Sequence, residues 1–276
     1  RDIKTIHYVA PSVWAWRPGR ADKMAQHIDH VLALLPFEPA FMHKAGMGCD
    51  FVGHHVASEE AVLVSEQDAL MARYNLDPAV KTIAVLPGSR RSEVSRLLPV
   101  FIDVLKHPAF ENTQLIFPTL PHLVEDIENF TAPLSQQVSI ICSRATASHA
   151  ARERAVATSL ADVALAASGT VSLELAAVGT PMVIAYDMNW LSRQIIGRML
   201  LIDTVTLVNL VTETRIVPEF IGKDCVAHDI APALEQLLGD PKTQKDQLDR
   251  CMNLLGRGEL SGGQRAAQAV VKVLNA

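Results

Sequence analysis

The sequence has few cysteines, and they lie far apart in the chain. Cys49, Cys142, Cys225 and Cys251 form no C-x-x-C pair, which argues against a disulfide framework or a zinc site and favours reduced thiols in a cytosolic protein. No apolar run approaches the roughly 20 residues that a transmembrane helix needs. The net charge of −5 argues against nucleic-acid binding as the main function.

Several motifs of well-known sites are missing as well. The sequence contains no G-x-x-x-x-G-K-[ST] phosphate loop, no G-x-G-x-x-G dinucleotide fingerprint, no G-x-S-x-G nucleophile motif and no H-E-x-x-H. His54 and His55 are adjacent, but neighbouring residues on a strand point to opposite faces and do not easily bind one metal ion. We therefore predict no metal site and no cofactor, and we expect one of these histidines to face a cleft at a strand end.

What the sequence does contain is an alternation of short apolar runs and helical segments. Its first part predicts strands at 3–9, 31–35 and 50–52 and helices at 21–30 and 40–45. The two prolines of PFEP predict a turn between the second strand and the second helix. This rhythm is typical of a parallel sheet.

A second alternation follows a polar and acidic stretch at 56–80, so we place a domain boundary near the start of that stretch. Helices are expected between the strands of this second series and at 229–238, 241–255 and 264–274, with an extended segment at 205–207. We predict an α/β fold with two parallel-sheet units. The strands expected in the second unit are 82–86, 115–117, 138–141, 163–166 and 181–186.

The stretch 166–181, AASGTVSLELAAVGTP, predicts a strand, a tight turn, a helix and a stop. The turn is Ser168, Gly169 and Thr170, whose backbone N–H groups would point beyond the strand at the positive end of the helix dipole. Glu174 lies one turn into the helix, close to the same face. A carboxylate there can accept hydrogen bonds from two adjacent hydroxyls while the amides hold phosphate. This is the layout of a nucleotide-sugar site, although helix capping alone explains many such turns.

A second strand–turn–helix pattern is LPGSRRSEV, which follows the strand at 82–86. Gly88 lets the backbone approach a ligand closely, and the N–H groups of the turn with the Arg90 guanidinium can hold a diphosphate. A solvated turn with surface arginines is the alternative. Two such turns at the carboxyl ends of strands in one sheet would converge on the crevice where open α/β sheets bind ligands.

Other candidate residues are ambiguous. Trp14 and Trp16 lie two residues apart beside Arg17, and they indicate either an aromatic plug or the wall of a cleft that binds an acyl chain or a sugar ring. Asn209 lies in an apolar stretch, where it is either a satisfied buried amide or a ligand contact. Glu219 follows a proline and is expected to be a capping or surface carboxylate unless the crevice lies beside it.

A helix is also expected at 189–201. It carries Leu191, Ile195 and Met199 on one stripe. Such a stripe is usually a core face, and a patch that meets lipid is the alternative.

Together these motifs resemble the lipid-A-disaccharide synthase family. The resemblance implies a GT-B-type fold with two Rossmann-like domains: residues 1–57 as the last part of the acceptor-side domain, 58–255 as the UDP-binding domain, and 256–276 as a helix that packs back on the first. The matching segments follow the family's order over nearly the whole chain: HYVAPSVWAWRPGR, LALLPFE, FVGH, LPGSRRSEV, ASGTVSLELA, PMVIAY, the Asn209 segment and VPE.

The resemblance also implies a reaction. The family transfers 2,3-diacylglucosamine from UDP-2,3-diacylglucosamine to 2,3-diacylglucosamine 1-phosphate (lipid X) with inversion and without a metal. By analogy, the diphosphate would meet the two turns, Glu174 would bind the ribose hydroxyls and Asn209 would lie near the donor. The turn residues are Gly88, Ser89, Arg90, Ser168, Gly169 and Thr170, and the candidates for acceptor-side or lipid contact are Trp14, Trp16, Arg17 and His54.

The expected setting is the cytoplasmic side of the inner membrane of a Gram-negative bacterium, with peripheral association, no nucleic-acid partner and a homodimer left open. The family's glycine-rich first turn and proposed aspartate base lie upstream of the Trp motif, so we expect the base to lie upstream of Arg1. Residues 143–160 look longer and more arginine-rich than the family pattern, and Val208 and 212–214 replace a proline and a glycine-containing loop. The alternatives are another UDP-sugar enzyme of the same fold and a UDP-binding fragment without catalysis.

Overall fold

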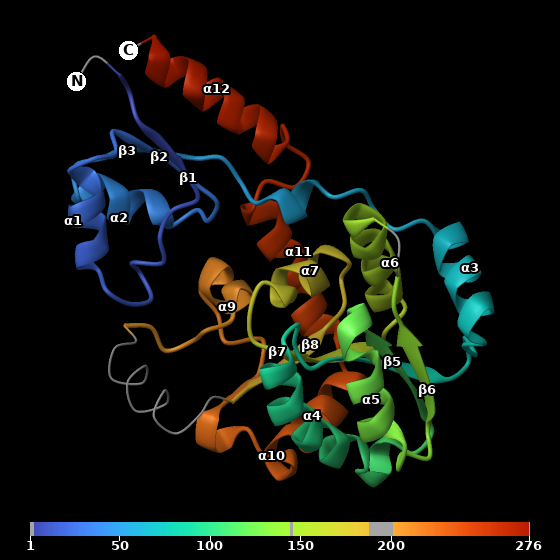
Figure 1. Cartoon of the computed structure of the whole chain (residues 1–276). Coiled ribbons are helices and arrows are strands. Elements are labelled where there is room, and N and C mark those ends of the chain that lie inside the picture. Colours follow the sequence, from blue (N-terminus) through green and yellow to red (C-terminus); the bar gives the residue numbers. More distant parts are fainter. Residues whose placement is uncertain (1–2, 144–145, 188–200, 276) are drawn as a thin grey trace.

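The structure is a computed structural model that describes residues 3–143, 146–187 and 201–275 (Figure 1). It contains two sheets, and all the strand pairs in both are parallel. A three-stranded sheet has the order β1-β2-β3, and a six-stranded sheet has the order β6-β5-β4-β7-β8-β9. The predicted α/β class is confirmed.

The first unit is built on β1 (Ile6–Tyr8), β2 (His30–Ala33) and β3 (Gly48–Phe51) with the helices α1 (Gly19–Ala25) and α2 (Glu38–Lys44). The turn predicted from PFEP is wrong in part, because α2 already begins at Glu38. Its proline lies in the first turn of the helix, where a missing N–H costs nothing because that N–H has no partner inside the helix.

The second unit holds the larger sheet and most of the helices. Its strands are β4 (Lys81–Leu86), β5 (Thr113–Pro118), β6 (Gln137–Ile141), β7 (Val163–Ala167), β8 (Met182–Tyr186) and β9 (Glu219–Ile221). Its helices are α3 (Val64–Tyr74), α4 (Arg91–Leu105), α5 (Val124–Thr131), α6 (Ala147–Ser159), α7 (Val171–Ala177), α9 (Leu207–Thr212), α10 (Ala227–Gly239) and α11 (Lys242–Leu254). Short 3-10 helices are η1 (His55–Ser58), η2 (Pro108–Phe110), η3 (Pro121–Leu123) and η4 (Gly222–Asp224).

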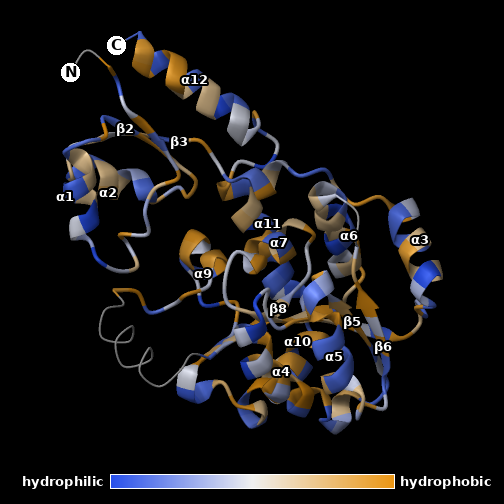
Figure 2. Ribbon diagram, in the orientation of Figure 1, coloured by the Kyte–Doolittle hydropathy of each residue, from blue (hydrophilic) through white to orange (hydrophobic). Residues whose placement is uncertain are grey.

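The inner strands β4, β5, β7 and β8 are buried almost throughout, without alternation, because both faces of the sheet are covered (Figure 2). One core cluster joins the sheet to α4, α5 and α10, and its large buried side chains include Phe101 and Phe117. The other cluster joins the opposite face to α6, α7, α9 and α11, with Leu173 and Leu248 buried in it. The result is a three-layer α/β/α unit.

The strand order places the two glycine-containing turns side by side. From β4 the chain adds β5 and β6 on one side of the sheet, and from β7 it adds β8 and β9 on the other side. β4 and β7 are therefore neighbours, with Leu86 paired to Ala166. Ligands of open α/β sheets bind where the strand order reverses in this way.

The last helix, α12 (Gly262–Leu274), returns to the first sheet, where Ala269 packs with Leu32 and Val52. Its Arg265 lies where the chain crosses between the two units, since a Cβ on Gly53 would come within 1.7 Å of the guanidinium nitrogen Nη2. The His54 N–H also donates to the Leu255 carbonyl at 3.2 Å. The two segments that connect the units, one at Gly53 and His54 and the other at Leu255, thus lie against each other.

Two expectations about the segment before β9 have different outcomes. The extended segment expected at 205–207 is wrong in its last residue, because α9 begins at Leu207. Residues 189–200 of the helix expected at 189–201, with its stripe of Leu191, Ile195 and Met199, lie outside the described residues. Among the helices that the structure describes, none has the length and apolar character needed to cross a bilayer.

Glu213, which ends α9, adopts a left-handed conformation with φ of 56°. This conformation brings a non-glycine Cβ too close to the following carbonyl oxygen. We expect Glu213→Gly to raise the free energy of unfolding by up to about 1 kcal/mol in urea titrations. Glu213→Ala is the control, because alanine keeps the Cβ. An equal gain in both variants would show that the backbone conformation is not the cause.

Candidate functional site

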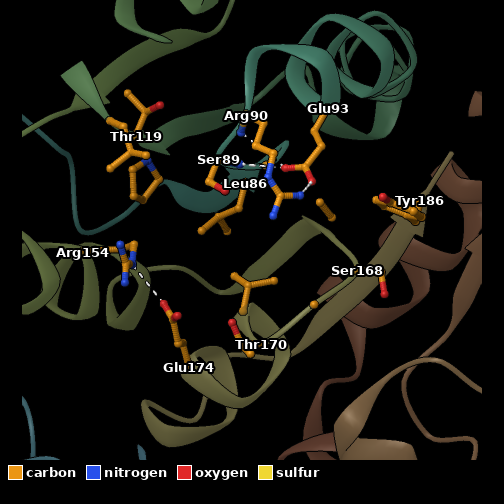
Figure 3. Close-up of a pocket in the computed structure, with 16 residues that line it drawn as sticks. Leu86, Ser89, Arg90, Glu93, Thr119, Arg154, Ser168, Thr170, Glu174 and Tyr186 are labelled. Atoms are coloured by element: carbon orange, nitrogen blue, oxygen red, sulfur yellow. Dashed lines mark hydrogen bonds and ion pairs between the residues drawn. The ribbon is translucent and has the colours of Figure 1, made fainter. Parts of the chain in front are cut away.

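A pocket of about 460 Å³ lies over the carboxyl ends of β4 and β7 (Figure 3). It joins the two turns that the sequence singled out, together with the Glu174 side chain from α7. Seven of the eight residues expected to bind the donor therefore lie around one cavity. They are Gly88, Ser89, Arg90, Ser168, Gly169, Thr170 and Glu174.

The Gly88 turn differs from expectation in one respect. Its N–H groups were expected to be available for phosphate, but those of Ser89 and Arg90 donate to Oε2 of Glu93 at 3.2 and 3.3 Å. The Arg90 guanidinium donates to Oε1 of the same carboxylate at 2.6 Å. Gly88 has φ of 124°, and a Cβ there would lie 2.8 Å from the Glu93 side chain, so the turn requires glycine. Glu93 supplies the anion at this turn.

The Ser168 turn leaves its donors open. The Ser172 hydroxyl donates to the Gly169 carbonyl at 3.0 Å and so fixes the carbonyl side of the turn. Among the described residues, the N–H groups of Gly169, Thr170 and Val171 have no hydrogen-bond acceptor. These residues line the pocket, so the amide donors expected from the sequence are present on this side.

Glu174 has a partner that sequence reasoning missed. Its Oε2 accepts a hydrogen bond from Nε of Arg154 on α6 at 3.0 Å, and both side chains line the pocket (Figure 3). Both are about one third exposed, so the pair is accessible to a ligand. The available signal was the arginine-rich composition of 143–160, which does not say which arginine points to Glu174. The contribution of Thr119 and Leu120, which follow β5 and also line the pocket, was not predicted from the sequence.

Asn209 lies outside this pocket. It is fully buried on α9, where its Nδ2 donates to the Val217 carbonyl at 2.9 Å and to Oε1 of Glu219 at 2.8 Å, and its Oδ1 accepts from the Val217 N–H at 3.0 Å. Glu219 also accepts the N–H groups of Val205 and Thr206 at the start of α9. The geometry gives Asn209 the role of a satisfied buried amide and Glu219 a capping role.

Comparison with known proteins decides the family. A model of the family described as lipid-A-disaccharide synthetase matches residues 1–273. The chain belongs to the lipid-A-disaccharide synthetase family. It is 52% identical over 273 residues to the lipid-A-disaccharide synthase of Ruegeria pomeroyi. The aligned region covers 98% of this chain and 68% of that protein. The chain thus spans about two thirds of that relative, and the family's members are glycosyltransferases of lipid A biosynthesis.

Solved structures show the same fold at low sequence identity. Anabaena Alr3699/HepE in complex with UDP-glucose has a TM-score of 0.57 and 11% identity, and the match covers 99% of this chain and 72% of that chain. The S. aureus MnaA co-structure with UDP has a TM-score of 0.62 and 14% identity, and the match covers 90% of this chain and 60% of that chain. The expected GT-B-type architecture is confirmed.

In this member of the lipid-A-disaccharide synthetase family, the Trp motif is held by a buried carboxylate. Trp14 donates from Nε1 to Glu38 at 3.2 Å and meets the ring of Phe37 edge-on at 5.3 Å between centroids. Burial raises the pKa of Glu38, although hydrogen bonds from Leu35 and Trp14 oppose the rise. The plug interpretation therefore describes Trp14.

Trp16 and Arg17 lie farther out on the same loop. The Arg17 guanidinium stacks 4.5 Å from the centroid of the Trp16 ring, and Arg17 is exposed. The loop also touches the second unit, because the Leu201 N–H donates to the Ala15 carbonyl at 3.0 Å. Neither Trp16 nor Arg17 lines the pocket, so a role for them would lie on the acceptor side.

His54 is buried at the crossing between the two units. Its Nδ1 accepts the Val56 N–H at 3.3 Å, and its ring stacks on His55 at 4.4 Å. Burial, followed by the nearby His55, lowers the pKa of His54 from 6.5 to about 4. The histidine lies apart from the pocket and is neutral at physiological pH.

This pKa predicts a pH dependence of stability. Between pH 6.5 and about 4, the unfolded chain binds a proton that the folded protein does not, so the free energy of unfolding falls as the pH falls. We expect a loss on the order of 2–3 kcal/mol from His54 by pH 4. Urea titrations at a series of pH values from 7.5 to 4.5 give the free energy of unfolding at each pH. This free energy should fall less steeply with falling pH in His54→Gln than in the wild-type protein. His149→Gln, at an exposed site, is the control, and an unchanged slope in His54→Gln would contradict the assignment.

Proposed function

We propose that this chain binds the UDP group of a UDP-activated, diacylated glucosamine in the pocket over β4 and β7. The full reaction is inverting transfer of 2,3-diacylglucosamine from UDP to lipid X, which gives lipid A disaccharide 1-phosphate and UDP. The observation that carries the proposal is that one cavity joins both glycine turns to the Glu174 carboxylate in a chain of this family.

The roles follow from the donors and acceptors around the cavity. The N–H groups of Gly169 and Thr170 bind the diphosphate from one side, and Arg90 binds it from the other. Glu174 accepts hydrogen bonds from the ribose hydroxyls. Donors fixed around the diphosphate stabilise the charge that develops on UDP as the sugar leaves, and Arg90 exchanges the Glu93 carboxylate for a phosphate oxygen.

Two fold relatives support a uridine nucleotide as the ligand. The Anabaena protein is a complex with UDP-glucose, and the S. aureus protein is a complex with UDP. Both share the fold of this chain, with TM-scores of 0.57 and 0.62. We infer the diacylated sugar and the lipid acceptor from membership of the lipid-A-disaccharide synthetase family.

The test is calorimetric titration of the protein with UDP, UMP and uridine at one salt concentration. We expect affinity to rise with each phosphate, and Arg90→Ala to weaken UDP by about tenfold with little effect on uridine. Arg91→Ala is the matched control, because Arg91 lies next to Arg90 but pairs with Asp126. Equal affinities for UDP and uridine would overturn the proposal.

We also propose that the protein works at the cytoplasmic surface of the inner membrane, because both sugar substrates carry acyl chains. Trp16, Arg17 and His54 are retained as candidates for the acceptor or lipid side, and Trp14 as the residue that fixes the loop of Trp16 and Arg17. Flotation with vesicles of anionic phospholipid tests the association. We expect the protein to float with the vesicles, and protein that stays at the bottom with and without lipid X would contradict the proposal.

A further inference from the structure

The charged residues of the pocket form two pairs. Of the described residues that line it, Arg90 and Arg154 are the cations and Glu93 and Glu174 the carboxylates. Arg90 pairs with Glu93 at 2.6 Å, and Arg154 pairs with Glu174 at 3.0 Å. The pairs come from different elements, since the first lies within the start of α4 and the second joins α6 to α7.

The second pair is not a local consequence of a helix end. Arg154 and Glu174 are 20 positions apart, and α6 must pack on β5 and α7 to bring them together. Only Nε of Arg154 is engaged, and in the described part of the chain its two Nη groups have no hydrogen-bond acceptor. The contact leaves Oε1 of Glu174 and further lone pairs on its carboxylate for a ligand.

The neighbouring Arg152 shows that α6 uses its arginines for different tasks. All three of its guanidinium nitrogens are engaged. Nε and Nη2 bind Glu66 at 2.8 and 2.5 Å, and Nη1 and Nη2 bind the carbonyls of Glu60 at 2.7 Å and Ala61 at 2.9 Å. Those contacts fix the segment that links the two units. Residues two apart on a helix point to nearly opposite sides, so Arg154 faces the pocket and not this linker.

A carboxylate beside a diphosphate site poses an electrostatic problem. Two like charges a few ångströms apart repel each other strongly at the effective dielectric constant of a protein surface, so Glu174 alone would disfavour the ligand whose ribose it binds. A flexible glutamate side chain also loses rotamer entropy when it is fixed by the ligand. A guanidinium bonded to Oε2 meets both difficulties, because it balances the charge and fixes the carboxylate before the ligand arrives.

We propose that Arg154 is a positioning residue that holds Glu174 in place for the ribose diol and so sets the preference for ribonucleotide over deoxyribonucleotide donors. This inference rests on the proposed binding of UDP. Arg154 acts through Glu174, and its effect is on the recognition of the sugar hydroxyls. The Arg154 contact accounts for the orientation of the Glu174 carboxylate toward the pocket.

The experiment measures the ratio of the Kd for 2′-deoxy-UDP to the Kd for UDP. In the wild-type protein we expect a ratio of about 10, because 2′-deoxy-UDP lacks the hydroxyl that donates a strong hydrogen bond to the charged carboxylate. Arg154→Gln is expected to lower the ratio to about 2 or 3, and Arg154→Lys to give a value between these. Glu174→Gln should lower the ratio as well, and the double variant should lower it no further, because the two residues act as a unit.

The control is Arg73→Gln. Arg73 lies on α3 and pairs at 2.6 Å with Glu153, the residue before Arg154 on α6. Arg73 does not line the pocket, so its removal should leave the ratio unchanged. Thermal unfolding of each variant checks that the fold is intact. A wild-type ratio retained in Arg154→Gln would overturn the inference while UDP binding stands. Failure of the wild-type protein to bind UDP would instead overturn the proposed function.

Discussion

Replacement of Glu174 by alanine should weaken UDP binding by about 10- to 100-fold. The carboxylate is expected to accept hydrogen bonds from both ribose hydroxyls, and hydrogen bonds to a charged group contribute about 1.5–3 kcal/mol. The loss should be much smaller for 2′,3′-dideoxy-UDP, which offers no hydroxyl to the carboxylate. Calorimetric titration of UDP and 2′,3′-dideoxy-UDP into the wild-type and Glu174→Ala proteins gives the four Kd values for this comparison.

The comparison separates recognition of the ribose from general damage to the pocket. Glu174 is partly exposed and its ion pair is with one side chain, so we expect little change in the free energy of unfolding. Equal losses for UDP and its dideoxy analogue would remove Glu174 from the ribose site. In that case its pairing with Arg154 would have only a structural role.

Replacement of Asn209 by alanine should lower the free energy of unfolding by about 3 kcal/mol or more. The amide is fully buried and satisfies both the N–H and the carbonyl of Val217, as well as an oxygen of Glu219. Removal of the amide leaves these groups buried without their partner, and each costs about 1–3 kcal/mol. Urea titrations at neutral pH measure the change.

Asn129→Ala is the matched control, because Asn129 is exposed on α5 and its loss should change stability by less than about 0.5 kcal/mol. The prediction also distinguishes the two roles considered for Asn209. A variant with wild-type stability and no UDP binding would identify a ligand contact. A destabilised variant that still binds UDP under native conditions would confirm the buried-amide role.

The strand–turn–helix patterns carried most of the information about the site. Both turns could be assigned because an apolar strand, a glycine and an amphipathic helix follow one another within a few residues, as at Gly88 and Gly169. Parallel strands put their carboxyl ends at one edge of a sheet, so a local pattern predicted a tertiary position. The position of Glu174 followed in the same way from helical spacing.

The partners of these residues could not be predicted. Glu93 is at the right spacing to cap the helix after Arg90, but spacing does not say whether that carboxylate or a ligand occupies the amides. Arg154 contacts Glu174 only because α6 and α7 pack together. Helix α9 was missed because its β-branched residues disfavour a helix, while Glu219 and Asn209 stabilise it through contacts distant in sequence.

The pairing of the charged side chains that line the pocket, among the described residues, has a consequence for how a nucleotide arrives. Two cations against two carboxylates leave no net side-chain charge among the described residues that line the pocket, and the protein as a whole carries −5. A dianionic nucleotide is therefore not drawn in from a distance, and its encounter rate should change little with ionic strength. Selectivity must arise after contact, through short-range donors, and release of the nucleotide product does not have to overcome a long-range attraction.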